Sequence, residues 1–496
     1  MRKLYYSTCS IAAPHIGVVI DDILLNKNSN NEIFWAYCNC ALSSCFKNLN
    51  GHKCICNFCH KMYKSYFREY GKGVTILPID KKRIEEKDHS WDTESVHAIK
   101  SIVYRNVYVG NSILSLYFSF TRDLDVVNFK GFKSFALPLI NEICGFVDYV
   151  YDLVDKIKPD EIIIYNGRLY ENRLFYDIAS TLKIKFKALE VVGGNVEPYK
   201  KVSFKGGLPH SITLNTQKIE KLWSSSPLSD EQKINIASSF YSRRRNGDLV
   251  ADVAVYTASQ KKNALPIDFD KKKRNIAIFN SSQDEIAALG GEWEIGKLFS
   301  TQYEAIEYVL KNADPKIHFY LRIHPNLRGV KHKEHLDLYK LEKYNNISVI
   351  SPESKVSTYA LLDCCEKVVV FGSTMGIEAT FWGKPSIMLG RSLYENLDVC
   401  YKLDNKEQLL SFLNNPYLTP KDKLGALKYS YYLLDREFKV DKNIIDIDVK
   451  VRKLRWNFAF TSYFKLFGSQ YLYQIAYLYY YILLPKFSKK THCFPW

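Results

Sequence analysis

Residues 368–390 read VVVFGSTMGIEATFWGKPSIMLG, and this stretch decides the fold. A continuous apolar run ends at Gly372, which predicts a buried strand that passes into a tight turn. Ser373 and Thr374 are residue types that begin helices, and the apolar run after Pro385 predicts a second buried strand. A strand, a helix and a further strand in this order indicate a βα unit of a parallel sheet.

The turn that follows Gly372 also has the chemistry of an anion site. Free backbone N–H groups at a helix start favour phosphate, and the hydroxyls of Ser373 and Thr374 can add hydrogen bonds. We expect Gly376 to let a ligand approach the first turn and Glu378 to accept hydrogen bonds from ribose or sugar hydroxyls. The alternative is that Ser373 caps a helix and Gly376 permits close packing.

The same alternation of short apolar runs and helical patterns recurs along the chain, with a long helix expected over residues 137–157. The predicted strands are residues 4–7, 33–37, 74–78, 161–165 and 184–190, and then 275–280, 318–323, 347–350, 367–371 and 385–389. We therefore predict an α/β protein with two Rossmann-like domains. The predicted boundaries are an N-terminal domain over 1–245, a linker over 246–273, a second domain over 274–440 and a helical segment over 441–496.

The composition is that of a folded protein of 496 residues, 47% hydrophobic and 25% charged. At roughly 150 residues per domain this length predicts two or three domains. Lys and Arg number 69 against 53 Asp and Glu, a net charge of +16. Such a surplus favours an anionic partner, which could be nucleic acid, membrane headgroups or a phosphorylated metabolite.

The amino terminus only faintly imitates a secretory signal, because His15, Asp21 and Asp22 interrupt its apolar stretch. We therefore expect a cytoplasmic protein in a reducing compartment, whose 12 cysteines are thiols or metal ligands rather than disulfides.

The segment from residue 450 to the carboxyl terminus holds eight Lys or Arg, no Asp or Glu, and many aromatic residues. Its apolar stretch, residues 471–484, is shorter than the roughly 20 residues of a membrane-spanning helix. We expect it to lie in the headgroup region of a membrane, with its rings at the interface and its cations against anionic lipid. The alternative is a helix that packs back across the domains.

Further polar residues follow other predicted strands. Arg322 and His324, in YLRIHPN, alternate on one strand and share a face near its end, where they can meet a phosphate. Asp284 and Glu285, in FNSSQDE, follow another strand of the second domain. Three more candidates end first-domain strands: Asn166 and Arg168, in YNGR, and Glu190. Ligands of open α/β sheets bind outside the carboxyl ends of strands, so we expect an interdomain cleft lined by these side chains.

Six cysteines crowd into residues 38–59. Cys56 and Cys59 have the spacing of a zinc knuckle, and Cys40 with Cys45 could supply the other pair of a tetrahedral site. The hypotheses are a structural zinc, an iron–sulfur cluster, or reduced thiols packed in a loop.

The sequence lacks the motifs of several protein classes. The sequence has no GxGxxG, no GxxxxGK[ST] and no HExxH, so dinucleotide oxidoreductases, P-loop NTPases and zincins are disfavoured. No nucleic-acid-binding module is present, and we interpret the basic run at 243–245 as a solvated linker face.

The combination of RIHPN, STMGIEATFWGKPSIMLG and Tyr394 resembles bacterial capsule and O-antigen polysaccharide biosynthesis proteins, including the Kdo-transferase-like group. The resemblance covers mainly residues 275–394. It implies a glycosyltransferase of GT-B architecture that needs no catalytic metal, with a nucleotide-sugar donor in the second domain and a glycan or lipid-linked glycan acceptor on the first. By position it implies that Ser373, Thr374, Gly376 and Glu378 hold the donor, together with Arg322 and His324.

Sugar transfer needs charge stabilisation on the departing phosphate, which Arg322, His324 and the turn at Ser373 could supply. A general base, or a nucleophile if configuration is retained, could be Glu190, Asp284 or Glu285. We therefore predict transfer of a hexosyl or Kdo-type sugar to a capsule or lipopolysaccharide glycan. The alternatives are a nucleotide-sugar 2-epimerase and a noncatalytic scaffold of a glycan assembly complex.

Overall fold

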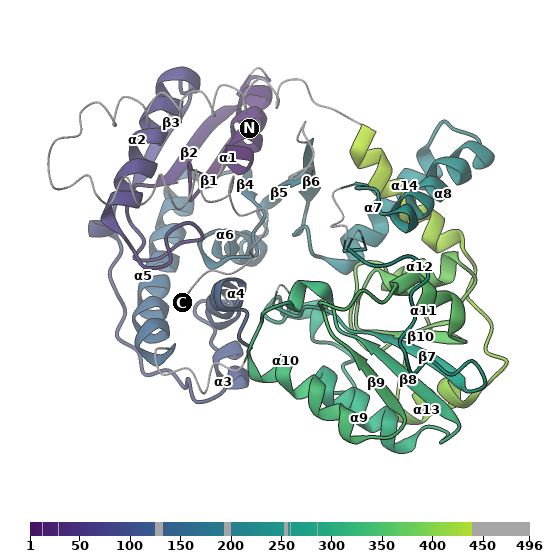
Figure 1. The fold of residues 1–496 in the computed structure, drawn as a ribbon. Helices are drawn as coiled ribbons and strands as arrows, with labels where there is room; N and C mark the ends of the chain where they lie inside the picture. Colours follow the sequence, from purple (N-terminus) through teal and green to yellow (C-terminus); the bar gives the residue numbers. More distant parts are fainter. Residues whose placement is uncertain are drawn as a thin grey trace, which may run out of the picture. The chain divides into compact units, whose positions relative to one another are not determined.

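The chain folds into two compact units. The first lies within residues 1–116 and 129–209, and the second takes in residues 117–128 and 210–439. The computed structural model describes residues 1–11, 13–27, 29–124, 132–192, 200–251, 256–257, 259–284 and 286–438. Figure 1 gives the course of the chain. The predicted helical segment over 441–496 lies outside the described residues.

The first unit is built on a six-stranded sheet with the order β3-β2-β1-β4-β5-β6. The strands are β1 (Arg2–Ser7), β2 (Glu32–Cys38), β3 (Thr75–Ile79), β4 (Glu161–Tyr165), β5 (Lys185–Val192) and β6 (Lys200–Lys205). The first five are parallel, and β6 joins the edge antiparallel to β5. The order reverses between β1 and β4, as in a doubly wound nucleotide fold.

Helices cover both faces of this sheet because successive strand residues point to opposite sides. Tyr5 and Trp35 face the core beneath α1 and α2, whereas Tyr6 points the other way and stacks on Phe175 of α6, 4.1 Å between ring centroids. Phe146 of α5 lies on that second side as well. The helices of this part of the chain are α1 (Ala13–Lys27), α2 (Lys53–Tyr70), α3 (Val96–Lys100), α4 (Val109–Thr121), α5 (Phe132–Ile157) and α6 (Tyr170–Thr181).

The second unit is built on a five-stranded parallel sheet with the order β11-β10-β7-β8-β9. Its strands are β7 (Arg274–Phe279), β8 (Ile317–Arg322), β9 (Ile347–Ile350), β10 (Lys367–Val370) and β11 (Ser386–Met388). Val368 and Val370 face α11 (Thr358–Cys364) and α12 (Met375–Phe381), whereas Val369 faces α9 (Gln302–Asn312) and α13 (Lys406–Asn414). The short helix α10 (Lys333–Asp337) lies between β8 and β9 in the chain.

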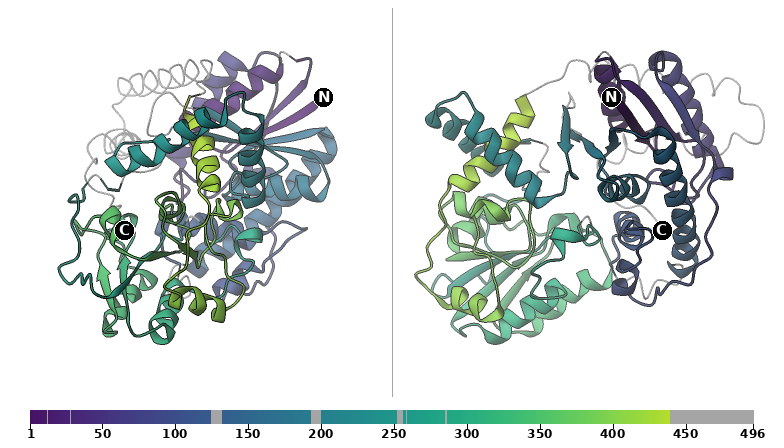
Figure 2. Two further views of the ribbon diagram at one scale, coloured as in Figure 1. Left: turned by 90° about the vertical axis from the view of Figure 1, so that its right-hand side faces the viewer. Right: turned by 180° about the vertical axis from the view of Figure 1, so that it is seen from behind.

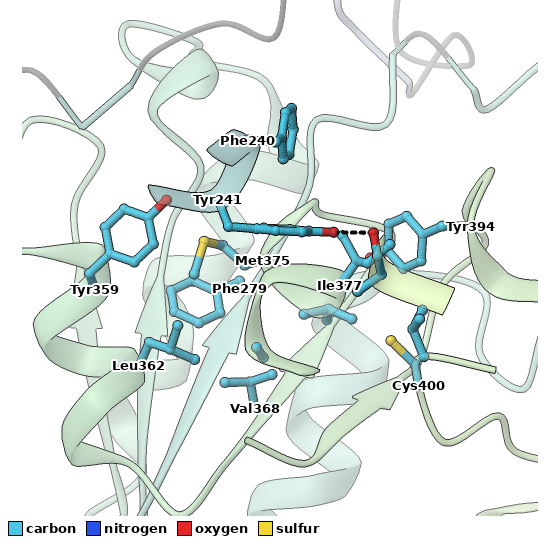
Figure 3. Close-up of a cluster of buried hydrophobic side chains, with 14 of the residues drawn as sticks. Phe240, Tyr241, Phe279, Tyr359, Leu362, Val368, Met375, Ile377, Tyr394 and Cys400 are labelled. Atoms are coloured by element: carbon cyan, nitrogen blue, oxygen red, sulfur yellow. Dashed lines mark hydrogen bonds between the residues drawn. The ribbon is translucent and has the colours of Figure 1, made fainter. Parts of the chain in front are cut away.

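Three longer helices complete the second unit: α7 (Ile212–Ser225), α8 (Asp230–Asn246) and α14 (Leu424–Phe438). Figures 1 and 2 show α14, in yellow-green, along α7 and α8. Tyr241 of α8 stacks on Phe381 of α12 with ring centroids 4.0 Å apart. Figure 3 shows Phe240 and Tyr241 in one apolar cluster with Met375 and Ile377, so α8 belongs to the core of this unit.

Because α8 packs in the second unit, that unit begins near residue 210 and not at the expected domain boundary at residue 245. The basic run at 243–245, which we interpreted as a solvated linker face, is the last turn of α8. Gly247, in the left-handed conformation with φ 86°, ends the helix. The Arg244 side chain is largely buried against α12, so the linker interpretation of this run is wrong.

The predicted fold class is confirmed, because each unit carries a parallel sheet of Rossmann-like order with helices on both faces. Every predicted strand is present, most with ends within one or two residues of those expected. No helix in the described part of the chain is both long enough and apolar enough to cross a membrane.

Candidate functional site

The strand order of the second sheet reverses between β7 and β10, the position where open α/β sheets bind ligands. We call residues 280–284, 323–326 and 372–374, which follow β7, β8 and β10, the second-sheet crest. Hydrogen bonds join these three segments. The Ser281 hydroxyl donates to the Phe371 carbonyl at 2.7 Å, and the His324 backbone N–H donates to Asn280 Oδ1 at 2.7 Å.

The turn after β10 lies partly at the surface, since Gly372, Ser373 and Thr374 are half-buried. Gly372 has φ 93°, and a Cβ there would collide with the Arg391 carbonyl, so the turn requires glycine. The Tyr394 hydroxyl donates to the Ser373 carbonyl from below the turn. The backbone of the turn is therefore fixed.

Gly376 and Glu378 lie deeper than expected. A Cβ on Gly376 would lie 2.6 Å from the Tyr394 hydroxyl, so this glycine permits close packing, the alternative we left open. Glu378 is fully buried and accepts hydrogen bonds from Arg244 Nε at 3.0 Å and from the Tyr359 hydroxyl at 2.6 Å. Arg244 Nη2 also lies 3.4 Å from Thr374 Oγ1. Glu378 therefore supports the crest indirectly, because it fixes the guanidinium of Arg244, which contacts Thr374.

Arg322 is bonded to the loop that follows β9. Its Nη1 donates to the Ser351 carbonyl at 2.6 Å and its Nη2 to the Ser354 carbonyl at 3.0 Å, and the residue is 3% exposed. Burial lowers the pKa of Arg322 to about 10. Its guanidinium thus organises the loop after β9, a different role from the predicted phosphate contact.

His324 keeps one ring nitrogen available. Its Nδ1 accepts the Asn326 N–H at 3.1 Å, which places the proton of the neutral ring on Nε2. Burial, and then the neighbouring Arg122 cation, lower the pKa of His324 to about 4. At neutral pH this histidine is therefore an uncharged hydrogen-bond donor.

Asn280 supplies a second donor. Its side chain is 1% exposed, and within the described residues its Nδ2 has no hydrogen-bond acceptor. A buried amide N–H without a partner is costly, and such groups are uncommon in folded proteins. Asp284 lies nearby, with Oδ2 3.2 Å from Arg122 Nε and a hydrogen bond from the Ser282 hydroxyl. Glu285 lies outside the described residues.

In the first unit, Glu190 and Asn166 meet at the ends of β5 and β4. The Glu190 carboxylate accepts hydrogen bonds from the Tyr165 hydroxyl at 2.8 Å, from the Asn166 amide and from the Val191 N–H at 2.9 Å. Asn166 has φ 56°, and its Oδ1 accepts the Arg168 N–H at 2.9 Å. These donors hold the carboxylate in one orientation at this edge of the sheet.

His15 was not among the predicted site residues, but it belongs to the same cluster. Its ring stacks on Tyr165 with centroids 4.2 Å apart. Burial, and then Lys47, lower the pKa of His15 to about 3, so it too is neutral at physiological pH.

The four predicted zinc ligands do not converge. Cys40 and Cys56 are in hydrogen-bonding contact, and that contact lowers the pKa of Cys56 to about 6. Cys59 instead accepts hydrogen bonds from Ser10, and Cys45 lies half-buried near Glu171. Among the described residues, no three His, Cys, Asp or Glu side chains form a group that could hold a metal ion. A structural zinc on these thiols stays a prediction that metal analysis of the purified protein tests.

Sequence reasoning missed Arg122 and Arg244, the two arginines that reach the crest and its support. Arg122 is 162 residues from Asp284, and Arg244 is 134 residues from Glu378. No local pattern links positions so far apart in the chain.

Comparison with known proteins supports the predicted resemblance. Residues 255–415, which contain the whole second sheet, match the model of the family described as capsule polysaccharide biosynthesis protein. This match confirms the resemblance over that part of the chain. No curated protein matches the sequence.

Solved structures similar to this chain include two KpsC enzymes from Thermosulfurimonas dismutans. The β-Kdo 2,4 transferase is 14% identical, with TM-score 0.36, over 55% of this chain and 79% of that one. The β-Kdo 2,7 transferase is 15% identical, with TM-score 0.33, over 57% and 79%. The UDP-GlcNAc 2-epimerase of Methanocaldococcus jannaschii, in complex with UDP-GlcNAc and UDP, is 13% identical, with TM-score 0.27, over 88% and 99%.

Proposed function

We propose that this chain is a glycosyltransferase that moves a sugar from a nucleotide-sugar donor to a capsule or lipopolysaccharide glycan. The observation that carries the proposal is the set of hydrogen-bond donors at the second-sheet crest. These are Asn280 Nδ2, the Nε2–H of His324 and the hydroxyls of Ser373 and Thr374. The match to the capsule polysaccharide biosynthesis family spans the same strands.

These donors suit the departing nucleotide phosphate. Negative charge develops on that phosphate as the glycosidic bond breaks, and preorganised donors in a partly dry site stabilise it. His324 acts here as a donor rather than as a general acid, because burial lowers its pKa to about 4. Glu378 and Arg244 act as positioning residues that fix Thr374 from behind.

We place the acceptor-binding site on the first unit. We assign Asn166 and Arg168 to contacts with acceptor hydroxyls, next to the oriented carboxylate of Glu190. An inverting transfer requires a base for the acceptor hydroxyl, and a retaining one could use a carboxylate nucleophile. Glu190, Asp284 and Glu285 remain the candidates for that role. Hexosyl and Kdo-type donors are both compatible with the crest.

Membrane attachment is part of the proposal. The basic, aromatic carboxyl-terminal segment would hold the enzyme at the cytoplasmic face of the inner membrane, where a lipid-linked acceptor grows.

A thermal-shift screen of nucleotide sugars tests the function. A ligand that binds only the folded state raises the melting temperature, so at least one UDP-, GDP- or CMP-sugar should do so. His324→Ala should remove the shift. His318→Ala, at the opposite end of β8, is the matched control and should retain it.

Product analysis then separates the alternatives. A 2-epimerase converts its nucleotide sugar without any acceptor, whereas a transferase needs one. Absence of a shift with every nucleotide sugar would contradict the proposal and favour the noncatalytic scaffold.

A further inference from the structure

A phosphate bound at the second-sheet crest would be stabilised by a cation, and both Nη atoms of Arg322 already have other partners. Phosphate carries negative charge, and neutral donors alone leave that charge without a counterpart. Both Nη atoms of Arg322 are bonded to carbonyls of the loop after β9, inside the second unit.

Arg122 brings a guanidinium to this position. Its Nε lies 3.2 Å from Asp284 Oδ2, on the loop after β7, and its Nη1 donates at 2.8 Å to the Asn326 carbonyl, on the loop after β8. Its side chain is 28% exposed, whereas that of Asp284 is 8% exposed. Arg122 therefore spans two segments of the crest and keeps part of its guanidinium open to a ligand.

The backbone around Arg122 is held in an unusual conformation. Arg122 has φ 60°, a left-handed conformation that costs free energy for a residue with a side chain. His332 Nε2 donates to the Thr121 carbonyl at 2.8 Å, and the Asp123 N–H donates to Thr121 Oγ1 at 3.1 Å. These bonds fix the segment on the second unit and direct Arg122 to the crest.

The charge of Arg122 also reaches His324. After burial, Arg122 is the largest of the influences that lower the pKa of this histidine. The cation thus lies within electrostatic range of the ring whose Nε2–H faces the proposed ligand. The guanidinium has five N–H donors, and its bonds to the described residues use Nε and Nη1, so Nη2 is left for a further acceptor.

We propose that Arg122 is the donor-binding cation of the second-sheet crest and contacts a phosphate of the nucleotide sugar. This inference rests on the proposed function and adds a residue to its site. The competing explanation is that Arg122 only neutralises and orients Asp284.

Calorimetric titration of UDP, of GDP and of CMP into the full-length protein separates these explanations. In Arg122→Gln, the affinity for whichever nucleotide the wild type binds should fall at least about tenfold, because a charge-assisted hydrogen bond is lost. Arg122→Lys should recover part of this loss, and the dependence of affinity on ionic strength should weaken in Arg122→Gln. Circular dichroism melts verify that the variants are folded.

Asp284→Asn is the discriminating variant. It removes the carboxylate and keeps the cation, so nucleotide affinity should fall much less than in Arg122→Gln. Arg105→Gln is the matched control, because Arg105 also has a positive φ, of 45°, and pairs with an aspartate, 2.6 Å from Asp148.

Wild-type affinity in Arg122→Gln, or equal losses in Arg122→Gln and Asp284→Asn, would overturn the inference while leaving the proposed function standing. Failure of the wild type to bind any of the three nucleotides would instead contradict the proposed function, and the inference with it.

Discussion

Glu378 is a buried carboxylate that forms an ion pair with Arg244. If Glu378 is replaced by Ala, the guanidinium of Arg244 stays in the interior without a counter-charge. Breaking one side of a buried ion pair costs about 3 kcal/mol or more. We therefore expect Glu378→Ala to lower the free energy of unfolding by about that amount, measured by urea denaturation.

The control for this change is Glu407→Ala, at an exposed position in the first turn of α13. It should cost well under about 1 kcal/mol. A Glu378→Ala protein as stable as the control would contradict the buried ion pair.

The lowered pKa of His324 predicts how the free energy of unfolding depends on pH. Its pKa is about 4 in the folded protein, against an ordinary value of 6.5, so the unfolded chain binds more protons between these values. Its contribution to stability is complete above pH 6.5 and is lost as the pH falls toward 4. The loss should approach about 1.4 kcal/mol per pH unit within that window.

Urea denaturation of the wild type and of His324→Gln at pH 7, 6 and 5 measures this contribution. Removing the titrating ring should flatten the decline. Equal slopes for the two proteins would show that His324 does not titrate with a lowered pKa.

At the scale of elements, α7 depends on a cap supplied from the chain after β7. The Glu292 carboxylate accepts the Ile212 N–H at 2.8 Å, the Thr213 N–H at 3.1 Å and the Ser211 hydroxyl at 3.0 Å. It therefore satisfies N–H groups that have no partner within the helix. Glu292→Ala should lower the free energy of unfolding by about 1–2 kcal/mol, because loss of an N-terminal cap costs this much.

Glu294→Ala, two residues away, is the matched control. Glu294 pairs with Lys297 on the surface, and its loss should cost about 0.5 kcal/mol or less. If both substitutions cost the same in urea denaturation, Glu292 is not the cap.

The elements of both sheets could be predicted because buried parallel strands are continuous apolar runs that glycine, proline or polar residues interrupt. The strand β6 was missed. Its sequence, KKVSFK, is rich in lysine, as suits a strand at the edge of a sheet. The helix α8 was missed as part of the second unit, because its basic last turn resembles a linker, although Arg244 is buried there.

Only the part of the candidate site whose residues are contiguous in the sequence could be predicted. Strand, glycine and hydroxyl residues in succession mark the turn at 372–374, and this turn is half-buried rather than sealed in the core. The orientation of Arg322 could not be deduced, since nothing in the order of residues says that the Ser351 and Ser354 carbonyls lie beside it. The contacts of Arg122 and Arg244 depend on tertiary packing for the same reason.

At the scale of the whole molecule, the proposed chemistry is divided between the two units. We propose that the hydrogen-bond donors and the cation of the second unit bind a phosphate, and the first unit holds an oriented carboxylate beside Asn166. The net charge of +16 agrees with an anionic ligand for the chain as a whole.

The central claim is that the second-sheet crest binds the nucleotide of a sugar donor, and Asn280→Asp tests it most directly. The substitution preserves the shape of the side chain and the acceptor for the His324 N–H, but it replaces the unpartnered Nδ2 with an anionic oxygen. By calorimetry with UDP, GDP and CMP, the wild type should bind at least one nucleotide. Asn312→Asp, at an exposed position of α9, should bind it equally, and Asn280→Asp should bind it at least about tenfold more weakly. Unchanged affinity in Asn280→Asp, or no binding of any of the three nucleotides by the wild type, would contradict this claim.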